Sequence, residues 1–404
     1  MRLVSGAPFS LIRNGLSDWP VTPPQNCQVA IVGAGIAGAF VADAMTNAGY
    51  TVTIMDRRLP GAGSTAANTG LVTYELDVEL GRLADRIGEP FAARSYRATA
   101  DAVRTLEALV STLPDDCGFT KRPSLYLGRG RRDMKRFVRE VDLRTNHGID
   151  ARLLSRDDVA AAGLAADGAI GTHTSAYVDP LRLVQALLER AQSMGAVICP
   201  HTTALAWTST GDGVHIETTR GNVTADWLIL ATGYETPSGL RNDLVALHST
   251  YALVTFPVDN CAEHRPLDTM VWDTGRPYSY MRPAENNRII IGGEDVPFRD
   301  VTWRDRLLPT KTRALEKRLR SLMPSDERET EFVWAGTFGE TRDGLPCIGP
   351  VPGMPRVLAA LGYGGNGIAF SVIASRVLRG IVLGEGHEDA ELFSLERDQS
   401  ARRS

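Results

Sequence analysis

The chain has 404 residues, 43% of them hydrophobic, and a formal net charge of −4 at pH 7. This length and apolar content suffice for two domains, or for one large interleaved domain, with a sizeable core. The slightly acidic balance argues against nucleic acid or an acidic membrane surface as the main partner.

The cysteines and histidines show no spacing that indicates a metal or redox centre. The five cysteines stand at positions 27, 117, 199, 261 and 347, and the seven histidines are isolated from one another. A reduced, cytoplasmic protein without a metal site is therefore expected. No signal peptide is predicted, because the N-terminus lacks an apolar stretch with a cleavage site, and no apolar run reaches the length of a membrane span.

The stretch CQVAIVGAGIAGAF, residues 27–40, predicts a buried strand, a glycine-rich turn and a helix. The glycines have GxGxxG spacing, and a second predicted strand at 51–56 ends on an acid. This unit is typical of dinucleotide binding. The glycines permit a tight turn, close approach of a pyrophosphate and close helix packing, and the acid accepts ribose hydroxyls. The predicted cofactor contacts are Gly33, Ala34, Gly35, Ile36, Ala37, Gly38 and Asp56.

The residues that follow favour FAD over NAD. Two arginines directly after the acid leave a contact to a 2′-phosphate open. Residues 61–77 (GAGSTAANTGLVTYELD) then form a loop of small and hydroxylated residues, where a nicotinamide dehydrogenase would begin its next crossover. Such a loop can lie flat against a large planar ring and donate backbone N–H groups to it. The predicted contacts here are Arg57, Arg58, Ser64, Thr65, Asn68, Thr69, Gly70 and Leu71.

The middle of the chain predicts a second βα layer. A helix opened by Asp179-Pro180 is predicted over 179–196. Strands at 197–207 and 225–230 follow, and the second of them ends on Ala-Thr-Gly. Further cofactor candidates in this layer are Ala204, Ala231, Thr232 and Gly233. Residues 118–128 also read as a strand, which belongs with the antiparallel strands of the last third and not with this layer.

The last third of the chain predicts antiparallel strands and two helices. Residues 248–258, 277–283 and 288–294 read as strands, with a hairpin turn at 285–287, and 301–323 reads as a charged helix.

The stretch GYGGNGIAF, residues 362–370, predicts a glycine-rich approach to a long buried helix. A helix N-terminus offers free N–H groups and a partial positive charge. We expect it to point at the pyrimidine edge of a flavin, because reduced flavin carries negative charge there. The predicted contacts are Gly364, Gly365, Asn366, Gly367 and Ile368.

These segments, together with WAGTFGETRDGLPCIGP at 334–350, resemble the FAD-dependent D-amino-acid oxidase superfamily, which includes glycine oxidase, monomeric sarcosine oxidase and γ-glutamylputrescine oxidase. The similarity runs from about Cys27 to about Gly384 and is closest to uncharacterised bacterial FAD-dependent oxidoreductases of that superfamily. The resemblance implies non-covalently bound FAD and places Gly336 beside it. Cys347 does not match the position of the covalent flavin tether in sarcosine oxidases.

The resemblance also implies an α/β fold, α+β overall, in which a Rossmann-type FAD-binding domain is interleaved with an antiparallel-sheet substrate domain. The expected segments of the FAD-binding domain are 26–85, 148–240 and 328–386. The expected segments of the substrate-covering domain are 86–147 and 241–327. Residues 1–25 are expected to be an N-terminal extension and 387–404 a C-terminal tail.

The implied reaction is oxidation of the C–N bond of an amine or amino acid. Hydride passes from the substrate to flavin N5, water hydrolyses the imine product, and oxygen or another acceptor reoxidises the flavin. The superfamily's amino-acid oxidases hold the substrate carboxylate with an arginine, at a place where this chain has Phe338. Amines or N-substituted compounds are therefore expected to be better substrates than simple α-amino acids.

Four further side chains are candidates for the substrate pocket. Arg282 is a second candidate for the carboxylate clamp, although an ordinary ion-paired arginine explains it equally well. Tyr251 and Tyr280 stand on predicted covering strands, and each is as consistent with plain packing. Glu294, at the end of its strand, is a weaker candidate for a polar pocket residue.

Two other functional classes stay open. A flavin monooxygenase or NAD(P)H-linked reductase would carry a Gly-Asp-Ala motif near the last helix or a second nucleotide fingerprint, and the chain has neither. A flavoprotein dehydrogenase subunit that passes electrons to a protein partner is the other class. It stays open because the strand RIIIGGE lacks the lysine that some relatives use to activate oxygen.

Overall fold

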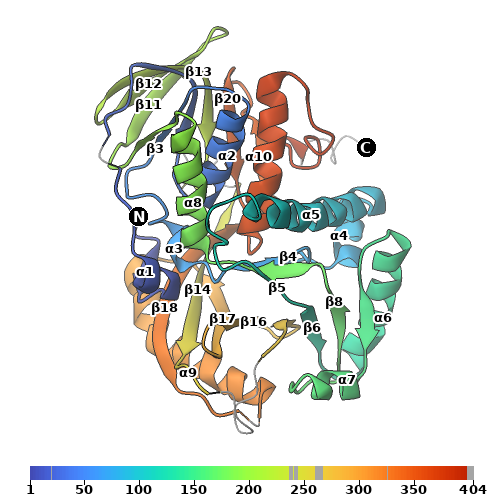
Figure 1. The fold of residues 1–404 in the computed structure, drawn as a ribbon. Helices are drawn as coiled ribbons and strands as arrows, with labels where there is room; N and C mark the ends of the chain where they lie inside the picture. The colour runs from blue at the N-terminus through green and yellow to red at the C-terminus, as the bar shows by residue number, and fades with distance from the viewer. Residues whose placement is uncertain (20, 236–239, 241–243, 260–266, 325, 398–404) are drawn as a thin grey trace.

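The computed structural model describes residues 1–397 except 20, 236–239, 241–243, 260–266 and 325. Within these residues the chain forms two large sheets, a small third sheet and ten helices. Figure 1 shows the two large sheets at opposite ends of the molecule, with the small sheet between them.

The first large sheet carries the dinucleotide-binding unit. Strands β10, β3, β2, β13 and β20 pair in parallel, and β12, β11 and β19 add antiparallel edges. Val29, Ala30 and Ile31 are fully buried, as expected for a parallel strand covered on both faces. The strands are β2 (Asn26–Val32), β3 (Val52–Met55), β10 (Val197–Cys199), β11 (Ala204–Ser209), β12 (Val214–Thr218), β13 (Gly221–Leu230), β19 (Cys347–Pro350) and β20 (Val357–Leu361).

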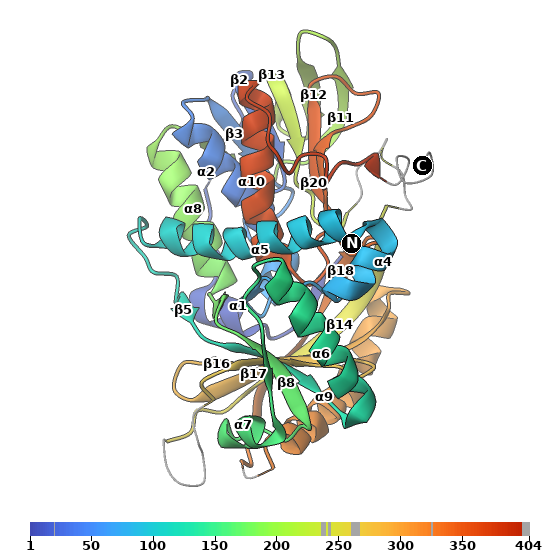
Figure 2. The same ribbon diagram turned by 90° about the vertical axis from the view of Figure 1, so that its right-hand side faces the viewer.

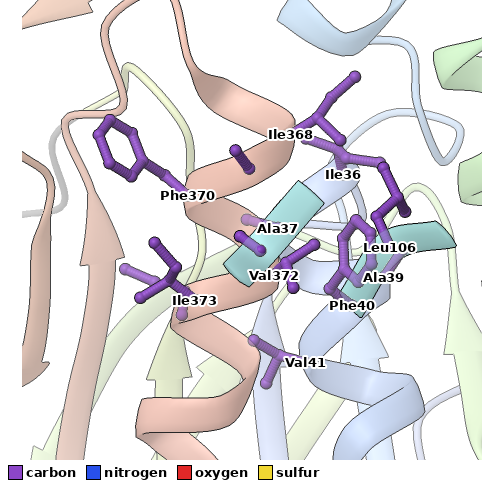
Figure 3. Packing of buried hydrophobic residues seen from close by; sticks show 14 of the residues in the cluster. Ile36, Ala37, Ala39, Phe40, Val41, Leu106, Ile368, Phe370, Val372 and Ile373 are labelled. Atoms are coloured by element: carbon purple, nitrogen blue, oxygen red, sulfur yellow. The ribbon is translucent and has the colours of Figure 1, made fainter. Parts of the chain in front are cut away.

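Three helices pack together against this sheet. They are α2 (Ile36–Asn47), α8 (Pro180–Ser193) and α10 (Gly367–Leu383), and α5 (Glu89–Val110) crosses α10. Figure 2 shows α5 running across the molecule between the two large sheets. Figure 3 shows Ile368 and Val372 of α10 facing Ile36 and Phe40 of α2. This apolar contact brings the N-termini of α2 and α10, which are far apart in sequence, to the same region.

The second large sheet has the order β1-β18-β14-β17-β16-β15-β6-β8-β7 within the described residues. One face packs on α9 (Val301–Leu322), where Leu253, Ile291 and Leu315 share a buried apolar cluster. The opposite face is turned toward the first sheet. The strands are β1 (Val4–Gly6), β6 (Ser124–Gly128), β7 (Arg152–Leu154), β8 (Gly168–Thr172), β14 (Ala246–Thr255), β15 (Met270–Asp273), β16 (Ser279–Ala284), β17 (Arg288–Pro297) and β18 (Thr330–Glu340).

The remaining elements lie between and beside the two large sheets. The small sheet has the order β4-β9-β5, and its strands are β4 (Leu71–Thr73), β5 (Thr120–Lys121) and β9 (Ser175–Tyr177). The remaining helices are α1 (Phe9–Asn14), α3 (Ser64–Ala67), α4 (Leu80–Ile87), α6 (Gly130–Asn146) and α7 (Arg156–Ala161).

Two expected elements take a different form in the structure. The single strand expected at 197–207 is divided into β10 and β11, because His201 adopts a left-handed φ of +53° and turns the chain between them. The strands then pair with different neighbours, β10 with β3 and β11 with β12. The loop expected over 61–77 contains the short helix α3 and the strand β4.

Several strands pair in a different sheet from the one expected for their part of the sequence. Strands β1, β7, β8 and β18 belong to the second large sheet, although they were expected in the N-terminal extension or in the FAD-binding domain. Conversely, α5 packs on α10, although it was expected in the covering domain. Which sheet a strand joins depends on pairing with strands far away in the sequence. Local sequence patterns do not show this pairing.

None of the helices in the described residues combines the length and the apolar character needed to cross a membrane. In the same part of the chain, no group of three or more His, Cys, Asp or Glu side chains is placed to hold a metal ion.

Candidate functional site

A cleft of about 410 Å³ runs between the two large sheets. It begins at the glycine-rich turn before α2, passes α3 and β4, and reaches the N-terminus of α10 and the inner face of the second sheet. Most of the predicted site residues line it. They are Gly33, Gly35, Ile36, Ala37, Asp56, Arg57, Arg58, Ser64, Thr65, Asn68, Thr69, Leu71, Ala204, Ala231, Thr232, Gly233, Tyr280, Gly336, Phe338, Gly364, Gly365, Asn366 and Gly367.

The turn between β2 and α2 needs glycine because other backbone segments approach it closely. Gly33 has a φ of +111°, and a Cβ there would overlap the carbonyl oxygen of Ala231. A Cβ at Gly38 would overlap the carbonyl oxygen of Gly33, so α2 packs directly on the turn. At Gly35 a Cβ would lie 3.1 Å from the hydroxyl oxygen of Thr65. The backbone at the N-terminus of α2 is therefore open to a ligand in the cleft.

Asp56 stands at one end of the cleft and is held in place by the backbone. Its carboxylate accepts hydrogen bonds from the N–H groups of Ala34 (2.8 Å) and Arg58 (2.8 Å). Burial raises the pKa of Asp56, and these hydrogen bonds oppose the increase. Arg57 and Arg58 both pair with Glu235, Arg58 at 3.0 Å. This pairing holds both guanidinium groups beside Glu235, where an incoming 2′-phosphate would have to compete with its carboxylate.

The loop around α3 links the cofactor end of the cleft to the second sheet. Thr65 accepts a hydrogen bond from the Ile36 N–H (3.1 Å), and the Ser64 hydroxyl donates to the carbonyl of Thr337 (3.0 Å). The side chain of Asn68 accepts from the Gly70 N–H at 2.7 Å. These contacts order the small-residue loop along the wall of the cleft.

The approach to α10 is built from residues that leave its first turn open. Gly362 and Gly364 have φ values of +74° and +54°, so the chain turns sharply before the helix. The Asn366 side chain donates to the carbonyl of Glu75 (2.8 Å), which ties the start of α10 to the segment after β4. The Gly365 N–H donates to Asp77 Oδ2 at 2.9 Å.

The inner face of the second sheet closes this end of the cleft with aromatic side chains. Trp272, Tyr278, Tyr280 and Phe338 line it, together with Thr250. The rings of Tyr278 and Tyr280 lie 6.1 Å apart, and Phe338 stacks on His248 with ring centroids 5.4 Å apart. Burial raises the pKa of Tyr280 to about 12, so its phenol stays protonated at neutral pH.

Four predicted cofactor contacts have structural roles and do not line the cleft. Gly38 packs on the turn, and Ala34 uses its N–H to hold Asp56. A Cβ at Gly70 would overlap the carbonyl of Val178. Ile368 is buried against α2 in Figure 3. Each of these residues supports the wall of the cleft without lining it. A sequence motif does not distinguish such a supporting residue from one that contacts the cofactor.

The structure places Tyr251 on the opposite face of the second sheet from the cleft. Its side chain packs toward α9, and its hydroxyl donates to the carbonyl of Arg304 at 3.2 Å. Thr250, its neighbour in β14, is the residue that lines the cleft. Neighbouring side chains of a strand point to opposite faces of the sheet. The sequence alone did not show whether the odd- or the even-numbered residues of this strand face the cleft.

Arg282 shares the inner face with Tyr280 but lies behind the wall of the cleft. Its Nε donates to the carbonyl of Thr69, its Nη1 donates to the carbonyl of Pro283 (2.8 Å), and its guanidinium lies 4.8 Å from the ring centre of Tyr177. Burial lowers the pKa of Arg282 to about 10. The side chain therefore fastens the segment before β4 to the second sheet, and it does not line the space where a substrate carboxylate would bind.

Sequence reasoning missed Asp77, which lines the cleft near the start of α10. It also missed two partly buried acids near Asp77 that do not line the cleft: Asp295, and Glu340, whose Oε2 lies 3.6 Å from His248 Nε2. Burial, together with the neighbouring carboxylates, raises the pKa of Glu340 to about 7. Burial likewise raises the pKa of Asp295 to about 6, and Asp77 shifts in the same direction. The signals available in the sequence were the acids in YELD, GGED and FGET, which lie in the predicted loop at 61–77, directly after the predicted strand at 288–294, and in the motif at 334–350.

The raised pKa of Asp295 predicts a stability that depends on pH. Because its folded pKa lies above its value in the unfolded chain, the folded protein loses stability as pH rises through about 4 to 6. Burial is the largest cause of this increase in pKa; the hydrogen bonds of Thr250 and Tyr278 and the charge of Lys311 oppose it, and the charge of Asp77 adds to it. We expect Asp295→Asn to be more stable than wild type by roughly 1–3 kcal/mol at pH 8. Thermal unfolding at pH 4 and pH 8 tests this, and a difference as large at pH 4 would contradict it.

Comparison with known proteins identifies the family. The model of the family described as FAD dependent oxidoreductase (DAO) matches residues 28–380. The chain belongs to this family. It is an FAD-dependent oxidoreductase, and FAD is its cofactor.

Relatives of this oxidoreductase extend over most of the chain. Glycine oxidase of Geobacillus kaustophilus is 25% identical over 369 residues, which cover 88% of this chain and 92% of that protein. D-amino acid dehydrogenase 2 of Ralstonia nicotianae is 24% identical over 416 aligned positions, covering 88% and 96% of the two chains. The solved structure of the Geobacillus glycine oxidase superposes with a TM-score of 0.77 at 22% identity, covering 93% of this chain and 99% of that one. The fold is therefore that of the glycine oxidase structure.

The residues of the cleft fit FAD. The cleft is elongated, it is lined by the N-termini of two helices, and its backbone is bare at Gly33, Gly35 and Gly365. A Cβ at Gly365 would lie 2.9 Å from Asp77 Oδ1, so only glycine leaves this part of the wall open. An elongated, negatively charged dinucleotide matches such a cradle.

Proposed function

We propose that this FAD-dependent oxidoreductase oxidises the C–N bond of a small amine or amino acid to an imine, which water then hydrolyses to a carbonyl compound and a free amine. The carbon loses a hydride and the nitrogen loses a proton. The observation that carries the proposal is the cleft itself, whose glycine-rich turns and helix N-termini fit FAD and whose α10 end is closed by the aromatic side chains of Trp272, Tyr278 and Phe338. The names of the glycine oxidase and D-amino acid dehydrogenase relatives support the same class of substrate.

We infer the following roles in cofactor binding. The first large sheet with α2, α8 and α10 binds FAD, and the second sheet covers the reacting end. Asp56 accepts from ribose hydroxyls, the turn at Gly33 and Gly35 receives the pyrophosphate, and the first turn of α10 stabilises negative charge on the reduced ring. Bound FAD supplies the acceptor for the hydride.

The side chains of this chain prepare the substrate for that transfer. An amine gives up hydride only when its nitrogen is neutral, so an ammonium substrate must first lose a proton. Glu340 lies beside Gly364 at the α10 end of the cleft and has a pKa of about 7, so we propose that it accepts this proton near neutral pH, through a bridging water because it does not line the cleft itself. Trp272, Tyr278, Tyr280 and Phe338 exclude water and orient the substrate between the sheet and the cofactor.

Anaerobic reduction of the bound flavin tests the proposal. We expect the visible flavin band to bleach when a pool of amines or amino acids is added, and to stay unchanged with a pool of hydroxy acids of matched size. The matched hydroxy acids control for binding without C–N chemistry. Bleaching by the hydroxy acids alone would show that the enzyme oxidises a C–O bond.

We also propose a cytoplasmic location. It is supported by the five cysteines, which stand at no disulfide or redox spacing in the sequence. Cell fractionation with an antibody against the protein tests it, and recovery in an extracytoplasmic fraction would overturn it.

A further inference from the structure

The segment formed by residues 1–14 connects the two halves of the molecule. Helix α1 packs on α3 and α8, and the Ser10 hydroxyl donates to Asp179, the N-cap residue of α8, at 2.5 Å. Strand β1 instead pairs antiparallel with β18 of the second large sheet, with Val4 opposite Gly336. Figure 1 and Figure 2 both show the N-terminus between the two large sheets. The segment therefore joins the dinucleotide-binding half to the second sheet.

Leu3 lines the cleft, although the sequence motifs predict no cofactor contact in residues 1–25. Its side chain is buried. On one side of it, a Cβ at Gly63, the residue before α3, would lie 3.7 Å from Leu3 Cδ1. On the other side, the carbonyl of Leu3 accepts a hydrogen bond from the N–H of Thr337 in β18 at 3.0 Å. Leu3 thus lies between the two walls of the cleft.

The chain continues from Leu3 toward the end of the cleft that holds Asp56. The carbonyl of Met1 accepts a hydrogen bond from Arg58 Nη2 at 2.6 Å, and Arg58 lines the cleft together with Asp56. Residues 1–3 therefore cross from β18, which carries Phe338, to the segment after β3. A ligand that extends from Asp56 to the start of α10 has to pass this crossing.

Few contacts fasten the crossing to the second half of the molecule. Strand β1 is a three-residue edge strand of its sheet in the described part of the chain. The Ser5 hydroxyl donates to Asp305 Oδ1 at the start of α9 (2.6 Å), and Arg304 Nη1 donates to the carbonyl of Arg2 (3.1 Å). A short edge segment held by so few hydrogen bonds can detach locally while the rest of the sheet stays folded.

We propose that residues 1–6 form a strap over bound FAD, in which Leu3 contacts the cofactor, and that the strap must detach from β18 before FAD can enter or leave. This rests on FAD binding in the cleft and not on the reaction proposed above. The strap shields the middle of the dinucleotide from water where the two sheets meet. It makes exchange of the cofactor slow, because a conformational step must precede both binding and release.

Exchange of bound FAD against an excess of isotopically labelled FAD tests the contact in the purified holoenzyme. Mass spectrometry of the bound flavin gives the dissociation rate constant. Mixing apoprotein with FAD, followed by flavin fluorescence, gives the association rate constant. Leu3→Ala removes most of the buried apolar side chain, so we expect FAD to dissociate about 10-fold faster and to associate no more slowly than in wild type.

Ser5→Ala tests detachment without changing a residue of the cleft. It removes the hydrogen bond to Asp305, while Asp305 keeps its pairing with Arg304 at 3.0 Å. The strap then opens more often, and both rate constants are expected to rise together by about 10-fold, with little change in the dissociation constant. A side chain that only stabilised the bound state would change the dissociation rate constant alone.

Ile12→Ala provides the control within the same segment. Ile12 is exposed on α1 and does not line the cleft, so exchange at the wild-type rate is expected. Thermal unfolding of the three apoproteins checks that each variant is folded. Unchanged exchange in Leu3→Ala or Ser5→Ala, a rise in only the dissociation rate constant of Ser5→Ala, or equal acceleration in Ile12→Ala would each overturn the proposal.

These measurements are independent of the proposed reaction, because FAD exchange requires no substrate. If exchange is unchanged in both strap variants while amines or amino acids bleach the flavin, the strap fails and C–N oxidation stands. If only hydroxy acids bleach the flavin, the proposed reaction fails, and the exchange rates still decide whether residues 1–6 retain the cofactor.

Discussion

Gly38→Ala is expected to abolish stable FAD binding, with a loss of affinity of about 100-fold or more. A Cβ at this position would overlap the carbonyl oxygen of Gly33. Both partners are backbone, so no side-chain rotation relieves the overlap, and α2 must move away from the turn. That movement displaces the N–H groups at the start of α2, which we propose face the pyrophosphate. Titration of the apoprotein with FAD, followed by flavin fluorescence, measures the loss.

A second glycine provides the control for this prediction. A Cβ at Gly211, in the turn between β11 and β12, would meet no atom within 4 Å, and its φ is not in the left-handed region. Gly211→Ala is therefore expected to bind FAD as wild type does. Wild-type affinity in Gly38→Ala would mean that the helix contact does not require glycine.

Arg144→Met is expected to lower the free energy of unfolding by about 3–5 kcal/mol. Arg144 is fully buried, and it pairs with Glu75 at 3.0 Å and with Glu140 at 2.9 Å. Methionine preserves most of the volume but leaves two buried carboxylates without a cation. Glu140 also accepts the N–H groups of Leu80 and Gly81 at the start of α4, so the damage reaches that helix. Urea unfolding measures the difference.

The pH dependence distinguishes lost charge from lost packing in this variant. An unpaired buried glutamate has a folded pKa above its unfolded value, so its cost is present at high pH and disappears as pH falls below the folded pKa. The deficit of Arg144→Met is thus expected to be larger at pH 8 than at pH 5. Arg104→Met, which removes an exposed arginine paired with Asp101, serves as the control and is expected to cost under about 0.5 kcal/mol. A deficit independent of pH would indicate that packing is the cause.

The Arg144 cluster also connects the core to the candidate site. Glu75 accepts a hydrogen bond from the indole N–H of Trp272 at 3.2 Å, and its backbone carbonyl accepts from Asn366 at the start of α10. Trp272 and Asn366 both line the cleft. One buried ion cluster therefore positions side chains at two walls of the cleft.

The cofactor half of the site was predictable because its residues act locally. Backbone geometry within a short segment determines the turn at Gly33, the position of Asp56 and the glycine-rich approach to α10. Features that depend on a short segment can be recognised as sequence motifs. Even there, the sequence did not separate residues that line the cleft from residues that pack behind it. Gly38 is required by its contact with the backbone of Gly33, and Ile368 is buried against α2, so neither lines the cleft.

The substrate half was not predictable in the same way. Glu294 was a candidate and Asp295 was not, yet a bulge in β17 turns Glu294 toward Lys311 and leaves Asp295 on the side of the cleft. Tyr251 was the candidate in β14, but its neighbour Thr250 is the residue that lines the cleft. A shift of one residue along a strand moves a side chain to the opposite face of the sheet. Arg282 is on the inner face of the second sheet, as its position in the sequence predicts, but its guanidinium donates a hydrogen bond to the carbonyl of Thr69.

The sequence by itself determined that this protein has a dinucleotide-binding unit, a second glycine-rich helix start and the resemblance to FAD-dependent oxidoreductases, because each rests on residues close together in the chain. Only the tertiary structure decided which side chains meet at the α10 end of the cleft. Asp77, Trp272 and Phe338, which line it, come from three segments that are joined by strand pairing and helix packing over long distances. Their arrangement is a property of that assembly, and it exists in no single segment of the sequence.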